Sequence, residues 1–395
     1  MVAISLVAGT RPEIIKLAPV DRLLRRRHPG AVRWIATGQH GLLASQALDE
    51  FGICPESKLR LARDAGDSRR TDMAQLPRQQ GSIAGVLSEL IEHLDAEFAR
   101  NPCEMVVVQG DTNSTLAAAL AAFSRGIPVA HVEAGLRTFN PQRPFPEETW
   151  RTLVSQIAEL HFAPTGHAAE NLQACGVPSD RIFVTGNTVI DSLHWIMRKS
   201  PCADIEHICA RPGRIVLATL HRRENWSGPV SEICRALRAL CDTVPDIRVY
   251  FIAHGNRALR RVVEERLAGT RRIEILDPLS YSDFVHLMKR SALVLSDSGG
   301  VQEEAPVLGV PVLVLRDATE RPEAVEQGAA LLVGTEPARI VASAAHLLTD
   351  EAAYRAMARP LSLYGDGHAS DRIAGIIESR LAREGSAPSA GVMAV

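Results

Sequence analysis

Short apolar runs alternate with longer amphipathic stretches along most of the chain. Residues 3–9 (AISLVAG) and 105–111 (MVVVQGD) are runs that predict buried strands, and residues 12–27 predict a helix that begins at Pro12. Further strands are expected at 32–38, 128–134 and 181–187. Strands that alternate with helices in this way are typical of βαβ units and therefore of a parallel sheet.

The same pattern starts again in the second half of the chain. Strands are expected at 214–221, 248–254, 272–278, 292–298 and 311–317. A helical stretch near 189–199 and a polar segment at 200–213 separate the two sets, so we place a hinge near 187–190. We therefore expect an α/β protein with two doubly wound domains that face a cleft.

Length and composition agree with two soluble domains. The chain has 395 residues, which is more than one ordinary core supports, and its formal net charge is −2. No basic excess argues for nucleic acid, and no run approaches the roughly 20 apolar residues of a membrane span. The seven cysteines form no C-x-x-C pair. We read them as reduced thiols and expect a cytoplasmic protein with no nucleic-acid or membrane partner.

Polar, titratable residues follow nearly every predicted strand. Ligands of doubly wound sheets bind beyond the carboxyl ends of the strands, so these positions matter. Capping explains Asp, Ser, Thr and Gly there, but it does not explain Arg, His and Glu. Together these strand ends indicate a binding cleft. They are Gly9–Pro12, Gly38–His40, Gln109–Ser114, His131–Arg137, His221–Asn225, His254–Asn256, Ser296–Gly300 and Arg316–Pro322.

The stretch SDSGGVQEEAP predicts a phosphate site. Its paired glycines 299–300 leave the backbone N–H groups of a helix N-terminus bare, and Ser298 adds a hydroxyl. Glu304, one turn later, can accept hydrogen bonds from ribose hydroxyls. A plain glycine turn is the alternative, and Arg321 with His221 favours phosphate. Neither G-x-G-x-x-G nor a Walker A sequence occurs, which argues against a nicotinamide dinucleotide or a P-loop.

Three carboxylates of the first half are candidate acid/base groups. For Asp111, the alternative to a catalytic role is helix capping. Glu133 ends an apolar strand. Glu147 lies in the first turn of a helix, where acidic residues are favoured in any protein. Lys16 lies one turn beyond Arg11. The alternative to a role in the site is that Lys16 lies on a solvent-exposed face of the helix. We find no cluster with metal-ligand spacing and no G-x-S-x-G, and so expect no metal and no hydrolase nucleophile.

Seven long motifs carry a family resemblance. They are GTRPEIIKLAPV, GDTNSTLAAALAAFSRGIPVAHVEAGLRT, PEETWR, GNTVIDSL, HRREN, SDSGGVQEEAPVLGVPVLVLRDATERPEAV and YGDGHASDRI. In this order, from about residue 4 to residue 380, they closely resemble the non-hydrolysing UDP-N-acetylglucosamine 2-epimerases. The resemblance implies two Rossmann-like domains in the glycosyltransferase-B arrangement. We thus expect residues 1–187 as the first domain, joined by a C-terminal helix at 368–385, 188–367 as the UDP-binding domain and 386–395 as a disordered tail.

The resemblance also implies an activity. Family members interconvert UDP-GlcNAc and UDP-ManNAc by eliminating UDP to give 2-acetamidoglucal and adding it back, with no cofactor. A UDP-sugar substrate, a homodimer and a role in polysaccharide or amino-sugar biosynthesis are therefore expected. Carried over by motif, the UDP ligands are Arg11, His221, Ser298, Gly299, Gly300, Glu304 and Arg321, with His221 also counted as catalytic. The catalytic carboxylates are Asp111, Glu133 and Glu147, and the supporting cations are Lys16, Arg137 and Arg151.

The chain departs from the family pattern at several positions. Trp150 stands where asparagine is usual, and Arg257 where proline is usual. Leu42 replaces the polar last residue of the Q-H-x-x motif that members with an allosteric UDP-GlcNAc site carry. Residues 55–82, which predict a mobile loop, also lack the usual pattern. We therefore expect simple saturation kinetics.

Other functions remain open at this point. The substrate could be a modified UDP-HexNAc, such as a 2,3-diacetamido uronic acid, or the enzyme could hydrolyse its intermediate and release ManNAc and UDP. A retaining glycosyltransferase shares the architecture but does not need all three carboxylates. A non-catalytic nucleotide-sugar sensor is the last alternative, and the intact carboxylates argue against it.

Overall fold

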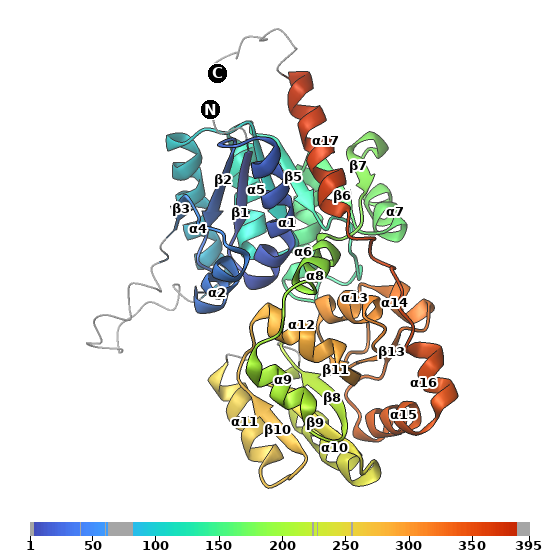
Figure 1. Cartoon of the computed structure of the whole chain (residues 1–395). Helices are drawn as coiled ribbons and strands as arrows, with labels where there is room; N and C mark the ends of the chain where they lie inside the picture. The colour runs from blue at the N-terminus through green and yellow to red at the C-terminus, as the bar shows by residue number, and fades with distance from the viewer. Residues whose placement is uncertain are drawn as a thin grey trace, which may run out of the picture. The chain divides into compact units, whose positions relative to one another are not determined.

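Two parallel sheets contain the strands that the apolar runs predict (Figure 1). The computed structural model describes residues 4–39, 41–59, 61, 82–222, 225–226, 228–253 and 256–384. The chain divides into one unit of Met1–Ser192 with Gly365–Val395 and a second unit of Leu193–Tyr364. The first division falls inside a helix, Thr188–Ile196, whereas the sequence placed the hinge near 187–190.

The first unit contains, within its described residues, a seven-stranded sheet in the order β3-β2-β1-β4-β5-β6-β7. Its strands are β1 (Ile4–Ala8), β2 (Val32–Ala36), β3 (Ser57–Lys58), β4 (Met105–Gln109), β5 (Val129–Val132), β6 (Leu160–Ala163) and β7 (Ile182–Val184). Every neighbouring pair is parallel. The strand order reverses between β1 and β4, which is the switch point where doubly wound sheets bind ligands.

Helices connect the described strands of this unit. They are α1 (Arg11–Arg27), α2 (Gly41–Phe51), α4 (Ile83–Arg100), α5 (Asn113–Ser124), α6 (Glu147–Ile157), α7 (Gly166–Ala174), α8 (Thr188–Ile196) and α17 (Ala369–Glu384). The Thr10 hydroxyl accepts from the Glu13 amide, and the Glu13 carboxylate accepts from the Thr10 amide at 2.7 Å, so a reciprocal capping box starts α1. Helix α17 packs against α1, where Arg27 pairs with Asp371 at 3.0 Å.

The second unit repeats the design. Its described residues form a six-stranded parallel sheet in the order β10-β9-β8-β11-β12-β13, with the reversal between β8 and β11. The strands are β8 (Arg214–Thr219), β9 (Ile247–Ile252), β10 (Ile273–Leu276), β11 (Ser291–Ser296), β12 (Val312–Val314) and β13 (Ala330–Leu332). The helices are α9 (Ala203–Ala210), α10 (Pro229–Thr243), α11 (Arg257–Leu267), α12 (Tyr281–Lys289), α13 (Gly299–Val307), α14 (Pro322–Glu326), α15 (Pro337–Thr349) and α16 (Glu351–Met357).

The structure differs from the sequence expectation in two segments. Residues 200–213, read as a polar segment, contain helix α9, whose Ile205 and Ile208 are buried. Of the loop expected at 55–82, residues 57–58 pair with β2 as strand β3, while residues 60 and 62–81 lie outside the described residues. The tail expected at 386–395 also lies outside them. None of the described helices combines the length and the apolar character that crossing a bilayer requires.

Candidate active site

The predicted residues of the first unit lie around its switch point. Arg11, the partly exposed first residue of α1, follows β1, while Asp111 follows β4 and Glu133 follows β5. Strands β1 and β4 are hydrogen-bonded neighbours, as are β4 and β5. The carboxyl ends of parallel neighbours meet at one edge of a sheet, so these three positions share that edge.

Glu133 is a buried carboxylate with three donors. Its Oε2 accepts from the Lys16 ammonium, from Gln109 Nε2 at 2.8 Å and from Asn187 Nδ2 at 3.2 Å. Its backbone has φ 64°, a left-handed conformation that is uncommon for a residue other than glycine and that is concentrated at functional sites. The strained backbone and the three donors fix both ends of this side chain.

The contact with Glu133 also shows that Lys16 is not a surface residue. The solvated helix face considered for it is wrong, because Lys16 is buried and pairs with Glu133. Gln109 and Asn187 were not assigned roles from the sequence. Both stand next to a predicted strand end, Gln109 just before Gly110 and Asn187 just after Gly186, so their positions alone could have drawn attention to them.

Asp111 is held by helix α6. Arg151 Nη2 forms an ion pair with Asp111 Oδ2, and Arg151 Nη1 lies 3.4 Å from Glu148 Oε2. Glu148 in turn accepts the backbone N–H groups of Thr138 at 3.0 Å and Phe139 at 2.9 Å. Arg151 and Glu148 are buried, whereas Asp111 stays partly exposed. Arg151 therefore positions Asp111, and Glu148 ties the 138–139 backbone to the same cluster.

Glu147 and Arg137 have different surroundings. Glu147 is the partly exposed first residue of α6, four positions before Arg151 and therefore on the same helix face. Arg137 is buried, and burial lowers the pKa of its guanidinium. Its hydrogen bonds run to the Leu136 carbonyl at 2.8 Å and the Ser155 hydroxyl at 2.9 Å. Glu147 thus lies on the Asp111 side of α6, while these hydrogen bonds of Arg137 lead to neither Asp111, Glu133 nor Glu147.

In the second unit, His221 follows β8 and is fixed by Asp297, which follows β11. Asp297 is fully buried and accepts the backbone N–H groups of His221 and Arg222, each at 3.0 Å, and Asn225 Nδ2 at 2.8 Å. His221 Nδ1 lies 2.8 Å from Asp297 Oδ1. Burial opposes ionisation of Asp297, but the His221 charge and these donors outweigh it and hold the pKa of that carboxyl well below its ordinary value.

Glycine is needed for a different reason at each of the first two positions of α13. A Cβ on Gly299 would lie 2.5 Å from Arg321 Nη1, whereas a Cβ on Gly300 would meet only Glu304 Oε2 and Ser298 Oγ, at 3.7 and 3.8 Å. The Ser298 hydroxyl makes no capping bond to the helix. Gly299 therefore makes room for the Arg321 guanidinium, and Gly300 leaves the first turn of the helix open.

Buried carboxylates surround the Arg321 guanidinium. Its Nε donates to Glu303, and its Nη1 donates to Glu320 Oε1 at 2.6 Å. Glu320 also accepts from Arg316 at 2.8 Å and from Arg222 at 3.0 Å. These contacts place a network of cations and carboxylates under the open helix end. Glu320 had no role in the sequence prediction, because nothing in its spacing identifies its partners.

Glu304 has a phenol partner that the sequence did not identify. The buried Tyr281 hydroxyl, at the start of α12, donates to Glu304 Oε1. Only one of the carboxylate oxygens is used in this bond. The two adjacent glutamates of α13 thus differ: Glu303 binds Arg321, and Glu304 is oriented by Tyr281.

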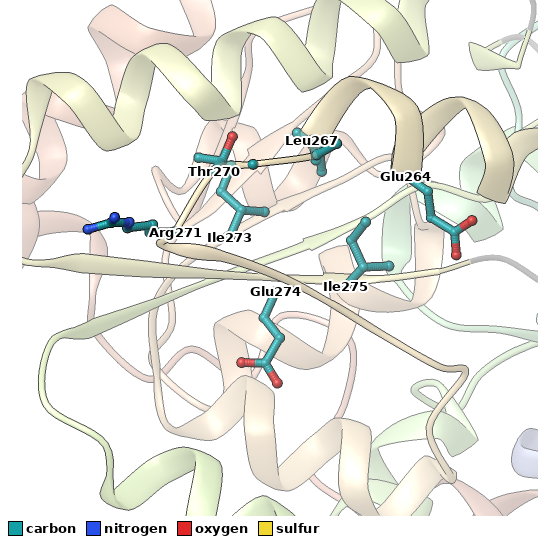
Figure 2. Close-up of a pocket in the computed structure, with 9 residues that line it drawn as sticks. Glu264, Leu267, Thr270, Arg271, Ile273, Glu274 and Ile275 are labelled. Atoms are coloured by element: carbon teal, nitrogen blue, oxygen red, sulfur yellow. The ribbon is translucent and has the colours of Figure 1, made fainter.

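Two surface hollows of the second unit lie away from these residues. One is lined by the end of α11 and by β10, including Leu267, Thr270 and Ile273 (Figure 2). The other includes Arg214 and Ser291, the first residues of β8 and β11. Both are at the amino ends of strands, opposite to the edge where such sheets bind ligands. Within the described residues, no group of three or more His, Cys, Asp or Glu side chains could hold a metal ion.

Comparison with known proteins identifies the family. The sequence model of the UDP-N-acetylglucosamine 2-epimerase family matches residues 23–378. The chain belongs to this family. It is 41% identical over 376 residues to the UDP-N-acetylglucosamine 2-epimerase of Escherichia coli K12, which covers 93% of this chain and 96% of that protein. The family prediction is confirmed, and so is the prediction that the chain is an enzyme.

Solved structures of other epimerases share its fold. The Neisseria meningitidis UDP-GlcNAc 2-epimerase bound to UDP-GlcNAc is 36% identical, with a TM-score of 0.87 over 95% of this chain and 100% of that one. The Methanocaldococcus jannaschii UDP-GlcNAc 2-epimerase in complex with UDP-GlcNAc and UDP is 32% identical, with a TM-score of 0.82 over 95% and 99%. The predicted α/β class with two doubly wound sheets is therefore confirmed for this epimerase.

Proposed function

We propose that this protein interconverts UDP-GlcNAc and UDP-ManNAc as a non-hydrolysing 2-epimerase that needs no cofactor. The observation that carries the proposal is the set of carboxylates at one sheet edge in a member of this family. Asp111 and Glu133 follow neighbouring strands, and Glu147 lies on the helix that holds Asp111. A protein that only bound the nucleotide sugar would not need this set.

The chemistry explains why several carboxylates are required. C2 of the sugar is not next to a carbonyl, so its proton is not removed by simple enolisation. In the proposed elimination a base takes the C2 proton, the C2–H electrons form the C1–C2 double bond, and the bond from C1 to the UDP oxygen breaks. The products are 2-acetamidoglucal and UDP. UDP then adds back at C1, and C2 is protonated on the opposite face. Two faces require at least two acid/base groups.

The surroundings of the carboxylates support distinct roles. Lys16, Gln109 and Asn187 all contact Glu133 Oε2, so this carboxylate is held in a fixed position, as a general base requires. Asp111 is partly exposed and is balanced by the Arg151 cation. We assign Asp111 and Glu133 to proton transfer at C2, with Glu147 as the third acid/base group. Arg151 and Arg137 stay behind them as supporting cations.

The second unit supplies the proposed diphosphate site. The open first turn of α13, Gly299 and Gly300, presents backbone N–H groups, and Ser298 adds an uncommitted cap hydroxyl. His221 and Arg321 are the proposed side-chain ligands of this site, and Arg11 of the first unit is a further proposed UDP ligand. Donors and cations of this kind stabilise the charge that develops on the leaving UDP. Glu304, oriented by Tyr281, is the proposed ribose ligand.

The proposal also covers the domain boundaries, the oligomeric state and the kinetics. We infer that residues 1–187 with the helix at 368–385 form one domain and that residues 188–367 form the UDP-binding domain. The proposed enzyme is a cytoplasmic homodimer. It follows simple saturation kinetics, because the exposed Leu42 offers no hydrogen bond to a second nucleotide sugar.

The test is proton NMR of UDP-GlcNAc with the protein in deuterated water. We expect UDP-ManNAc to appear, deuterium to enter at C2 of both epimers, and the rate to survive EDTA. Product that kept its C2 proton would contradict the elimination. Accumulating free ManNAc would indicate the hydrolysing variant, and an unchanged UDP-GlcNAc spectrum would point to a modified UDP-HexNAc or to a sensor.

A further inference from the structure

Two adjacent residues of helix α6 contact the connection between β4 and α5. Arg151 pairs with Asp111, and Trp150 Nε1 donates to Asn113 Oδ1 at 2.9 Å. Asn113 is the first residue of α5, and both Trp150 and Asn113 are partly buried. The Trp150 ring also packs against the apolar cluster under α4 and α5. Helix α6 is therefore attached to the Asp111 segment by one ionic contact and one neutral contact.

The start of α6 depends on such tertiary contacts. Its N-cap residue is Pro146, which makes no side-chain hydrogen bond to the helix. A side-chain cap normally satisfies one of the free N–H groups of the first turn and fixes where the helix begins. Here the first turn contains Glu147, the proposed third acid/base group, one turn before Arg151. Next to Glu147, Glu148 is tied to the 138–139 backbone, and one turn later α6 is held at Trp150 and Arg151, so the position of Glu147 depends on both sets of contacts.

The two attachments respond differently to proton transfer. If Asp111 takes up a proton during turnover, its ion pair with Arg151 loses most of its Coulomb attraction. The hydrogen bond from Trp150 to Asn113 joins two uncharged groups, so its strength does not depend on the protonation of Asp111. The neutral contact thus holds α6 through the step in which the ionic one weakens.

We propose that the Trp150–Asn113 hydrogen bond is a positioning clamp that keeps Glu147 in register with Asp111 during the reaction. This inference rests on the proposed function. Trp150 stands where the family pattern has asparagine, and asparagine carries its donor on a much shorter side chain. From the same backbone position an asparagine would not reach Asn113, so the clamp is a property of this chain and not of the family pattern.

The test is a double-mutant cycle with Trp150→Phe, Asn113→Ala and the double variant. The clamp predicts that either single change lowers kcat for epimerisation roughly threefold to tenfold, the range of one neutral hydrogen bond, with KM nearly unchanged. The double variant is expected to be no slower than the worse single variant. More free 2-acetamidoglucal and UDP should escape per turnover, because a displaced Glu147 delays reprotonation. Leu153→Ala, at an exposed position of the same helix, is the control and should change neither quantity.

The outcomes separate the clamp from a packing role. Multiplicative losses in kcat, or a coupling that appears only in the melting temperature, would overturn the clamp and leave Trp150 as a packing residue. Asn113→Ala removes no ring, so it remains informative if Trp150→Phe folds poorly. A wild-type protein that catalysed no C2 exchange would overturn the proposed function and the clamp with it, whereas an active wild type with unaffected variants would overturn the clamp alone.

Discussion

Asp297 contacts His221 twice: its carboxylate accepts the His221 backbone N–H at 3.0 Å and lies 2.8 Å from the imidazole Nδ1. The carboxylate is fully buried, while the histidine side chain is partly exposed. Since the ring nitrogen that faces Asp297 is Nδ1, Nε2 is the nitrogen left for a ligand. Asp297 is thus a positioning residue for the proposed leaving-group contact.

Replacing Asp297 by asparagine should impair catalysis through His221. We expect Asp297→Asn to lower kcat/KM roughly 10- to 100-fold, because it removes a charge-assisted hydrogen bond worth about 1.5–3 kcal/mol. Steady-state kinetics would measure the change. In a His221→Ala background the same substitution should add little, since the group it positions is gone. Equal losses in both backgrounds would mean that Asp297 acts on the local backbone and not through the imidazole.

Two buried histidines predict a pH dependence of stability. Burial lowers the pKa of His131 from 6.5 to about 4 and that of His161 to about 3, and the two residues are paired on neighbouring strands. The unfolded chain takes up protons below about pH 6.5, and the folded chain does not until much lower pH. The stability is therefore fully present above pH 6.5 and falls as the pH drops toward about 4, by at most about 1.4 kcal/mol per pH unit for each histidine.

Denaturant unfolding between about pH 7 and pH 5 would measure this slope. His131→Gln keeps a donor near the position of Nε2 for the Gly110 carbonyl, which lies 2.7 Å from His131 Nε2, but cannot titrate. The variant should flatten the slope, while His167→Asn, at an exposed position, should leave it unchanged. A slope identical in wild type and His131→Gln would show that His131 is not a neutral buried group in the folded protein.

The two glycines of α13 allow a matched comparison. Gly299→Ala places a methyl group against the Arg321 guanidinium, which Glu303 and Glu320 hold in place. We expect this variant to lose stability by about 1–3 kcal/mol, as overpacked sites do, and to bind UDP weakly. The methyl group added by Gly300→Ala would make only ordinary van der Waals contacts, and alanine has a higher helix propensity than glycine. This variant should therefore be at least as stable as wild type.

The decisive measurements on these variants are melting temperature and calorimetry with UDP. If α13 binds the diphosphate, the Gly300 methyl group obstructs the open turn, and Gly300→Ala should lose UDP affinity without losing stability. If Gly300→Ala bound UDP with full affinity, the first turn of α13 would not be the diphosphate site. An unchanged melting temperature in Gly299→Ala would show that Arg321 can shift despite its two carboxylate partners.

Much of the fold could be predicted from the sequence because the apolar runs are also the segments that tertiary packing buries. The apolar runs at β1, β4, β8 and β11 are central strands, buried on both faces. Helix α9 was missed because its buried face consists of little more than Ile205 and Ile208 within a polar segment. The predicted site residues follow strands, and strand ends are visible in a sequence.

Their partners could not be predicted in the same way. Lys16 looks like a helix-surface residue by period alone, and its partner Glu133 is 117 positions away. The close approach of Gly299 and Arg321 joins the start of α13 to the loop before α14, and Glu320 in that loop accepts from Arg316, Arg321 and the distant Arg222. Such contacts are set by tertiary packing, which neither periodicity nor spacing reports.

The remaining prediction separates proton transfer from binding at the three carboxylates. Asp111→Asn, Glu133→Gln and Glu147→Gln keep the side-chain shape and remove the charge. If the groups move protons, each variant should lose about 10²–10⁴ in turnover, with UDP affinity changed far less. Glu133→Gln should be the most severe, because it also leaves the buried Lys16 ammonium without its carboxylate. Steady-state kinetics, C2 exchange and UDP calorimetry together measure these effects.

Glu133 and Lys16 allow a further distinction. The double variant Glu133→Gln with Lys16→Met removes both charges, so it should recover stability relative to Glu133→Gln but not activity. Recovery of activity would mean that Glu133 only neutralises Lys16.

For Glu147, turnover within about threefold of wild type in Glu147→Gln, a loss much smaller than that expected of a general acid or base, would remove it from the mechanism. The same result for both Asp111→Asn and Glu133→Gln would contradict the elimination itself, because no other carboxylate follows β4 or β5 within the described residues.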